Sequence, residues 1–562
     1  MNLAFWSPLG LLLIPLFQRG PGARLLDTED APVGAAVQNS SSCARCHSNA
    51  PTSTAMRDPH GRGIAPYDLW QSSMMANAAR DPLWRAVVSA EVAATPSRRA
   101  EIEATCLSCH APMAELIGLE EHETGSLMHV LDCDSELGEL ARDGVSCTVC
   151  HGMSPDGLGT EASFTAGFQL DEHRRIFGPH GDPFAMPMRM TTGFTPTQGE
   201  HILDSALCGS CHTLETEALD PDGQPVGATL LEQAPYLEWR NSVFNDERAQ
   251  PGPLAASCQS CHLPTRDGQG TEIVTRIVRN PGGGDFAATG PRAPFGQHVL
   301  VGGNTLVLSM LRDHADELGV QASPDAMQAT IDATRDQLQN RTANLAIEGV
   351  ESGAGRLSFN VDVENLTGHK LPTAHPTRRA WLRVIVRDAR GAVLFASGNT
   401  DARGRIVDED GQPLPSELAG GPTEPHRDVV RASSEVASYR AVMADIHGAA
   451  THTLIRGASW LIDDRLLPKG WSADHPDAAR TRPIGVDGDP SFGPGADRVR
   501  FEVDLGSTNG LRIEAALLYQ PLSARWAAEL MRWDTPEIDT FRRLYEQAEL
   551  APEVIASADW QR

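Results

Sequence analysis

The pentapeptide Cys147-Thr-Val-Cys150-His151 shows the pattern that decides the fold of this 562-residue chain. Cys-x-x-Cys-His occurs five times, with its thiols at Cys43, Cys46, Cys106, Cys109, Cys147, Cys150, Cys208, Cys211, Cys258 and Cys261. The histidines that close the motifs are His47, His110, His151, His212 and His262. Two thiols at this spacing form thioether bonds with one haem, and the next imidazole binds its iron. The sequence therefore predicts five covalent haem c groups.

Other uses of paired cysteines do not account for the histidine in every motif. Disulfides of exported proteins, zinc sites and thiol redox centres use Cys-x-x-Cys without that requirement. Cys133 is the single cysteine of the eleven outside the motifs, and we expect it to be a free or structural thiol.

The spacing of the motifs predicts how the interior is filled. Their first cysteines are separated by 63, 41, 61 and 50 residues, which leaves too little chain for a separate apolar core around each haem. The macrocycles must then fill the interior and lie close together. Axial ligation, burial and nearby charge would set the reduction potential of each haem, so electron hopping is the simplest use of the arrangement.

Each iron also needs a sixth ligand or keeps an open position. The histidine candidates are His60, His122, His129, His173, His180, His201 and His298. The methionine candidates are Met74, Met75, Met113, Met153 and Met188. Two imidazoles give a lower potential than His with Met.

Composition limits the partners and the compartment. The chain has 47 Lys plus Arg against 74 Asp plus Glu, a formal charge of -27, which argues against nucleic-acid binding and favours redox partners with basic docking surfaces. Residues 3–17 are apolar and too short for a comfortable membrane span, so residues 1–25 are expected to be a signal peptide or an N-terminal anchor. Together with the haem motifs, this segment predicts export to the periplasm or the outside of the cell, with no transmembrane span in the mature chain.

Periodicity along the chain predicts an α+β multidomain protein. A loop-rich helical pentahaem region at 40–265 precedes a helical connector at 266–344, with helices expected around 306–318 and from Ser323-Pro324-Asp325 to about residue 340. Strand patterns, either alternating apolar and polar side chains or apolar runs, occur at residues 357–364, 381–387, 392–395, 499–505 and 511–519. They predict an antiparallel β-sandwich-like domain at 345–525. A helix at about 524–547 would close it within a C-terminal helical segment at 526–562. The segment GVDGDPSFGPGAD, with Asp487, Asp489 and Asp497, either binds calcium or is an ordinary Asp/Gly turn, and it lacks the Glu of an EF-hand loop.

Several longer segments resemble those of a known family. DGVSCTVCHGM, EQAPYLEW, HVLVGGNTLVLSMLRD and TGHKLPTAHPTRRAWLRV are similar to exported multihaem c-type cytochromes with a cytochrome c-552/4-like haem region and a C-terminal β-domain. The resemblance implies electron transfer outside the cytoplasm and distal ligation of haem iron by His298 and His369. His375 stands where a small residue is expected, so it carries less weight.

Three classes of function remain open at this point. An electron carrier with six-coordinate haems is favoured over a catalyst. The second class is an oxidoreductase in which one haem keeps an open face for a small nitrogen compound or similar inorganic substrate, and the third is a haem-stabilised binding module. No Cys-x-x-Cys-Lys motif occurs, so the chain is less similar to multihaem nitrite reductases, and no catalytic residue is predicted.

Overall fold

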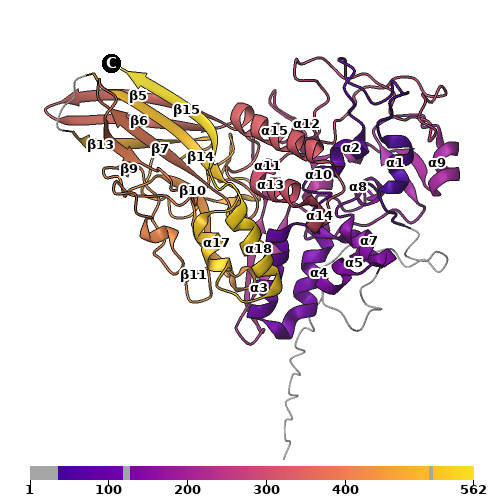
Figure 1. The fold of residues 1–562 in the computed structure, drawn as a ribbon, viewed down its shortest axis with the longest axis horizontal. Helices are drawn as coiled ribbons and strands as arrows, with labels where there is room; N and C mark the ends of the chain where they lie inside the picture. The colour runs from indigo at the N-terminus through magenta and orange to yellow at the C-terminus, as the bar shows by residue number, and fades with distance from the viewer. Residues whose placement is uncertain (1–35, 118–126, 506–509) are drawn as a thin grey trace, which may run out of the picture.

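The chain folds into two differently built halves that lie side by side (Figure 1). The computed structural model describes residues 36–117, 127–505 and 510–562. The expected signal peptide or anchor at 1–25 and the ligand candidate His122 lie outside the described residues. None of the helices in the described ranges is long and apolar enough to cross a membrane.

The N-terminal half consists mainly of short helices and loops. Its helices are α1 (Ser41–His47), α2 (Pro66–Gln71), α3 (Pro82–Ala94), α4 (Arg99–His110), α5 (Pro112–Ile117), α6 (Leu127–Asp132), α7 (Glu136–Arg142), α8 (Cys147–Gly152), α9 (Ala185–Thr192), α10 (Ser205–Gly209), α11 (Pro235–Arg240) and α12 (Cys258–His262). Two small sheets complete it. β1 (Arg175–Gly178) pairs in parallel with β2 (Thr195–Gln198), and β3 (Leu214–Leu219) pairs antiparallel with β4 (Pro225–Gln233).

Every Cys-x-x-Cys-His motif lies on a short helix or overlaps its end. Four motifs lie within α1, α4, α8 and α12, and the fourth motif in the chain begins in α10. Residues three and four apart lie on the same face of a helix. The helical turn therefore brings both thiols and the imidazole of a motif to one side.

The C-terminal half is built from two sheets packed face to face. One contains β5 (Ala343–Gly353), β6 (Arg356–Asn365), β13 (Ala496–Asp504) and β9 (Val429–Val430), in that order. The other contains β11 (Ala450–Thr451), β10 (Ser438–Ala444), β7 (Arg379–Arg387), β14 (Arg512–Gln520) and β15 (Glu553–Gln561), with β12 (Ser459–Asp463) on β10 and β8 (Val393–Ser397) on β7. A short helix, α16 (Ala478–Thr481), lies in the loop after β12. The predicted α+β class and β-sandwich-like domain are thereby confirmed.

The core of the sandwich follows the predicted alternation. Phe359 of β6 and Phe501 of β13 stack with ring centres 5.1 Å apart, and both are buried. They belong to one apolar cluster with Leu382 and Val384 of β7. Pairing of Val386 with Phe395 confirms the predicted hairpin of β7 and β8.

The connector contains the two expected helical stretches, one of them interrupted. The stretch expected around 306–318 is divided at His314 into α13 (Thr305–Asp313) and α14 (Ala315–Leu318). The second is α15 (Pro324–Arg341), whose N-terminus is capped by the Ser323 hydroxyl, which accepts a hydrogen bond from the backbone N–H of Ala326.

The C-terminal segment differs from the helical segment expected at 526–562. The closing helix is two helices, α17 (Ala524–Leu530) and α18 (Pro536–Gln547), because Pro536 begins a new helix whose cap is Thr535. The chain then forms strand β15, which lies along β14. Only Ile555 of this strand is fully buried, so the sequence has no run of apolar side chains to indicate it. Helices α17 and α18 share an apolar cluster with α3 of the N-terminal half, and all three are close together in Figure 1.

Candidate haem-binding site

One continuous cavity of about 1870 Å³ runs through the N-terminal half. It is larger than the roughly 300–1,000 Å³ of an ordinary small-molecule pocket. All ten motif cysteines and all five motif histidines line it. The five sequence motifs therefore face one shared interior space.

Thiols of different motifs are neighbours inside this cavity. The thiol of Cys43 lies close enough to that of Cys147 to alter its pKa, and the same holds for Cys109 with Cys211 and for Cys208 with Cys258. All of these cysteines are free thiols. In space, the first motif thus neighbours the third, and the fourth neighbours both the second and the fifth. Groups attached at these positions would be adjacent to one another.

Four of the five motif imidazoles are held in the orientation that a metal ligand needs. Their Nδ1 atoms lie within hydrogen-bonding distance of backbone carbonyl oxygens: His47 with Ile277 at 3.1 Å, His110 with Ala78 at 3.2 Å, His151 with Phe177 at 2.6 Å and His262 with Val301 at 2.8 Å. A carbonyl only accepts, so Nδ1 carries the proton and Nε2 keeps its lone pair for a metal. Burial also lowers the pKa of His110 to about 4, which keeps this ring in the neutral form that binds metals.

The donor set therefore fits covalently attached haem. Paired thiols and an imidazole line a large, mainly apolar space at every motif, and at four of the five Nε2 is free. The cysteines would form the thioether bonds, and the histidines would bind the iron.

His298 lies opposite a motif histidine at the separation that a shared metal requires. Its ring is nearly parallel to that of His151, with centroids 6.2 Å apart and an interplanar angle of 22°. With metal–nitrogen bonds of about 2 Å and each ring centre roughly 1 Å behind its nitrogen, two imidazoles on one metal have centroids about 6 Å apart. Nδ1 of His298 lies 3.0 Å from the carbonyl oxygen of Gly296, so Nε2 is again free. Burial lowers its pKa to about 4.

His369 also lines the cavity, although it comes from the loop after β6. Its Nδ1 lies 2.9 Å from the carbonyl oxygen of Lys370. The Asn365 amide donates to the carbonyl oxygen of His369 at 2.9 Å and so fixes the loop. Burial lowers the pKa of His369, and nearby charges include His262 of the fifth motif. The side chain is therefore placed to bind a group held at the fourth or fifth motif.

The remaining ligand candidates fall into two groups. His180, Met74, Met75, Met153 and Met188 line the cavity. The others have partners elsewhere: His60 pairs with Asp267, His173 with Glu172, His129 with Cys133 and His201 with the carbonyl oxygen of Met153, while Met113 accepts a hydrogen bond from Thr148.

The structure adds three cavity residues that the sequence did not single out as functional. Glu91 and Glu232 are buried beside the second motif, where burial raises their pKa values to about 8 and about 7. His375 lies 3.9 Å from Glu232 and also lines the cavity. Burial lowers its pKa to about 3. Glu232 opens the segment EQAPYLEW, and the family resemblance of that segment was the available signal.

Comparison with known proteins supports the fold. No family model matches the chain, and no curated protein does. Among solved structures, it is similar to a penta-heme cytochrome c552 from Thermochromatium tepidum, with 17% identity and a TM-score of 0.51. The match covers 95% of this chain and 100% of the other. At this identity the likeness shows a shared fold over nearly the whole length.

Proposed function

We propose that the protein is a multihaem c-type cytochrome that carries single electrons through five haem c groups. The observation that carries the proposal is the shared cavity, in which all five motifs meet and thiols of different motifs are neighbours. Haem iron supplies one-electron redox chemistry whose potential depends on its axial ligands and surroundings. The similar fold of a penta-heme cytochrome c552 supports the same assignment.

The motif residues have two separate tasks in this proposal. The ten cysteines attach the cofactors, and His47, His110, His151, His212 and His262 bind iron from one side. His298 binds the iron of the third motif from the other side, as the ring geometry with His151 supports. His369 is the second distal ligand, delivered by the loop after β6 of the β-domain.

The organisation of the chain and its surroundings belong to the same proposal. Residues 40–265 form the pentahaem unit, 266–344 the connector and 345–525 the β-domain, followed by the C-terminal segment. Covalent haem and the apolar N-terminal sequence support export to the periplasm or cell exterior. The formal charge of -27 supports basic redox partners.

A second candidate function has its own supporting observation. Glu91, Glu232 and His375 lie next to the second motif, where they could exchange protons with a substrate. An open-faced haem at Cys106–His110 would then act on a small nitrogen compound or similar inorganic substrate. Binding of cyanide or nitrite by a high-spin haem favours this candidate, whereas uniformly low-spin haem favours the carrier.

The test counts haems and electrons in protein matured with the haem-attachment machinery. The wild-type chain should contain five haems and accept five electrons in a reductive titration. A Cys147→Ala/Cys150→Ala double variant should hold four of each. Cys133→Ala is the matched control, since this thiol lies outside the motifs and should leave both numbers at five. Fewer than five haems in the wild type, or an unchanged number in the double variant, would overturn the proposal.

A further inference from the structure

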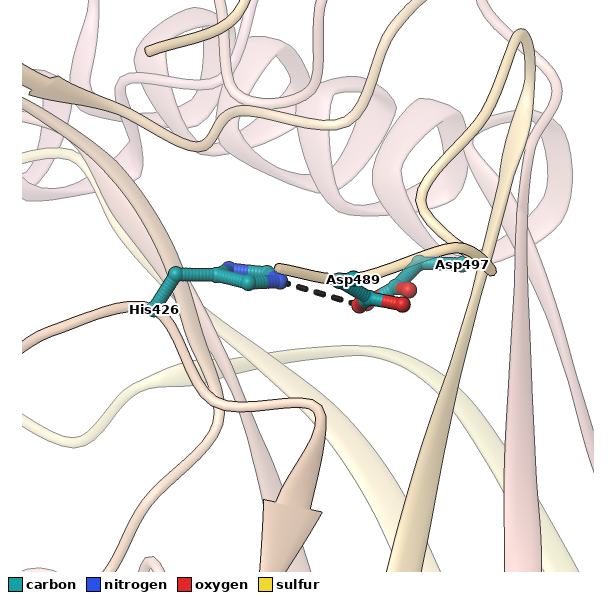
Figure 2. A group of neighbouring side chains, drawn as sticks. All are labelled: His426, Asp489 and Asp497. Carbon is teal, nitrogen blue, oxygen red and sulfur yellow. Dashed lines mark hydrogen bonds and ion pairs between the residues drawn. The ribbon is translucent and has the colours of Figure 1, made fainter. Parts of the chain in front are cut away.

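A second group of metal-binding side chains lies in the β-domain, away from the haem cavity. His426 comes from the loop before β9, Asp489 from the long loop before β13, and Asp497 from the start of β13 itself. Figure 2 shows the three side chains pointing toward one another. One ligand atom from each lies within 4.8 Å of the others. The sandwich therefore assembles the group from segments far apart in the sequence.

The cluster is enclosed by protein. The side chains of His426 and Asp489 are 6% and 2% exposed, and Asp497 is also buried. Nε2 of His426 lies 3.2 Å from Oδ2 of Asp489. Tetrahedral ligands about 2.1 Å from a zinc ion lie about 3.4 Å from one another. This pair is therefore already spaced as neighbouring ligands of one cation.

Asp464 orients the imidazole from its other side. Its Oδ2 lies 3.4 Å from Nδ1 of His426, and it is fully buried. A neutral imidazole has one N–H, so it donates to only one of two carboxylates. When Nδ1 donates to Asp464, the Nε2 lone pair faces a carboxylate oxygen of Asp489. Only a second ring proton or a cation makes that contact favourable, and a carboxylate that orients a ligating histidine is a common feature of zinc sites.

The carboxylates around the cluster call for a positive charge at its centre. Three carboxylates, Asp464, Asp489 and Asp497, are buried here; the guanidinium of Arg440 lies 3.8 Å from Asp464, and Arg465, which pairs with Asp463, also interacts with Asp464. Asp497 accepts hydrogen bonds from neutral donors: the Tyr439 hydroxyl at 2.8 Å, the Ser491 hydroxyl and the backbone N–H of Arg498. Buried carboxylates are costly unless a positive charge balances them. A divalent cation between the three side chains would balance two of these carboxylates, whereas a second proton on His426 would add one positive charge.

We propose that His426, Asp489 and Asp497 bind one divalent transition-metal ion, with zinc as the test metal. An imidazole nitrogen with carboxylate oxygens is a ligand set for zinc and related ions, whereas calcium takes oxygen ligands. This ligand set differs from the calcium site considered for GVDGDPSFGPGAD. Asp487 is exposed and lies outside the cluster, and the third ligand is His426. The ion would tie the loops before β9 and β13 to the end of the sandwich.

The test uses the full-length, haem-loaded protein. After treatment with a chelator, wild-type protein is titrated with zinc, and bound zinc is measured against haem iron. We expect one zinc for every five irons and a rise in the unfolding temperature of the β-domain. The variants are His426→Asn and Asp489→Asn, the second nearly isosteric in case the first fails to fold. The control is His447→Asn, since this histidine is exposed on a turn of the same domain.

The outcomes separate a metal site from a protonated ion pair. Stoichiometric zinc that both cluster variants lose and the control keeps would establish the site, and an anomalous-scattering peak between the three side chains would place it. Folded wild-type protein that binds no zinc would overturn the proposal and leave His426 as an imidazolium between two carboxylates. Equal binding by the variants would overturn it as well.

Discussion

Replacement of His298 by alanine tests whether this residue is the distal ligand of the third haem. The ring centre of His298 lies 6.2 Å from that of His151, and its Nδ1 is hydrogen-bonded to the carbonyl oxygen of Gly296, so that Nε2 has no hydrogen-bond partner within the described part of the chain. Alanine removes the only atom that could reach the iron from this side chain and leaves the motif intact. One iron of five should therefore lose its sixth ligand.

The expected magnitude follows from the number of motifs. About one fifth of the haem should change from low-spin, six-coordinate to high-spin, five-coordinate. Electron paramagnetic resonance and visible spectroscopy of the oxidised protein measure that fraction. The altered haem should also bind cyanide, at one equivalent per chain. His298→Met should restore a six-coordinate haem with a higher potential, because thioether ligation raises the potential relative to a second imidazole.

The control is His173→Ala, since His173 is 71% exposed, pairs with Glu172 and lies outside the cavity. Its spectra should match those of the wild type. A folded His298→Ala protein with five haems, all of them low-spin and closed to cyanide, would refute the ligand assignment and the inference from ring geometry on which it rests.

Three other experiments test the buried carboxyl beside the second motif, the core of the sandwich and the attraction to a redox partner. Burial raises the pKa of Glu232 to about 7, so its carboxyl is neutral below that pH and anionic above it, and the anion stabilises ferric haem. The potential of the nearby haem should therefore fall as pH rises through 7, by at most about 59 mV per pH unit. A potentiometric titration of Glu232→Gln that gave the same slope would contradict this. Phe359→Ala removes a fully buried ring that stacks on Phe501, so it should lower the free energy of unfolding by about 3–5 kcal/mol in denaturant titrations. A loss of less than about 1 kcal/mol would contradict the packing of this ring in the core. Electron exchange with a basic redox partner should slow as ionic strength rises, because the chain carries a formal charge of -27; a stopped-flow rate that is independent of salt would exclude electrostatic steering.

Features that depend on short sequence intervals were predictable. The motif residues i, i+3 and i+4 meet on one helical face regardless of the rest of the fold. Alternation along residues 357–364 specifies a strand with one buried face, and Phe359, Val361 and Val363 are indeed in the core. In both cases the chemistry of neighbouring residues is sufficient, and no long-range information is needed.

Features that depend on contacts between distant segments were not predictable. The break between α17 and α18 has a local cause, the proline at position 536. β15, in contrast, forms a strand because it pairs with the edge that β14 offers, and its own side-chain pattern does not indicate it. The grouping of His426 with Asp489 and Asp497 depends on the register of β13 against its neighbours. Selection among the histidine candidates likewise required the backbone partner of each ring, which the sequence does not show.

Two of the segments that carry the sequence resemblance, TGHKLPT and EQAPYLEW, meet at one buried network with Asp463 and Arg465. Lys370, one of two lysines in the chain, lies in TGHKLPT, and its ammonium contacts Asp463 at 2.6 Å. Asp463 also pairs with Arg465, which lies 3.4 Å from Glu238 of EQAPYLEW. Glu238 in turn accepts the backbone N–H of Lys370 at 3.0 Å.

This network connects the β-domain to the haem region at the point where His369 enters the cavity. A buried ion pair adds little net stability relative to apolar packing, yet loss of one partner leaves an uncompensated charge and costs about 3–5 kcal/mol. Such a network therefore fixes the relative position of the segments that it joins more than it adds to the free energy of unfolding. Because Lys370 directly follows His369, any shift of the β-domain against α11 would move the imidazole relative to the cavity. The β-domain thus acts, under the proposed function, as the support that holds a distal ligand in place.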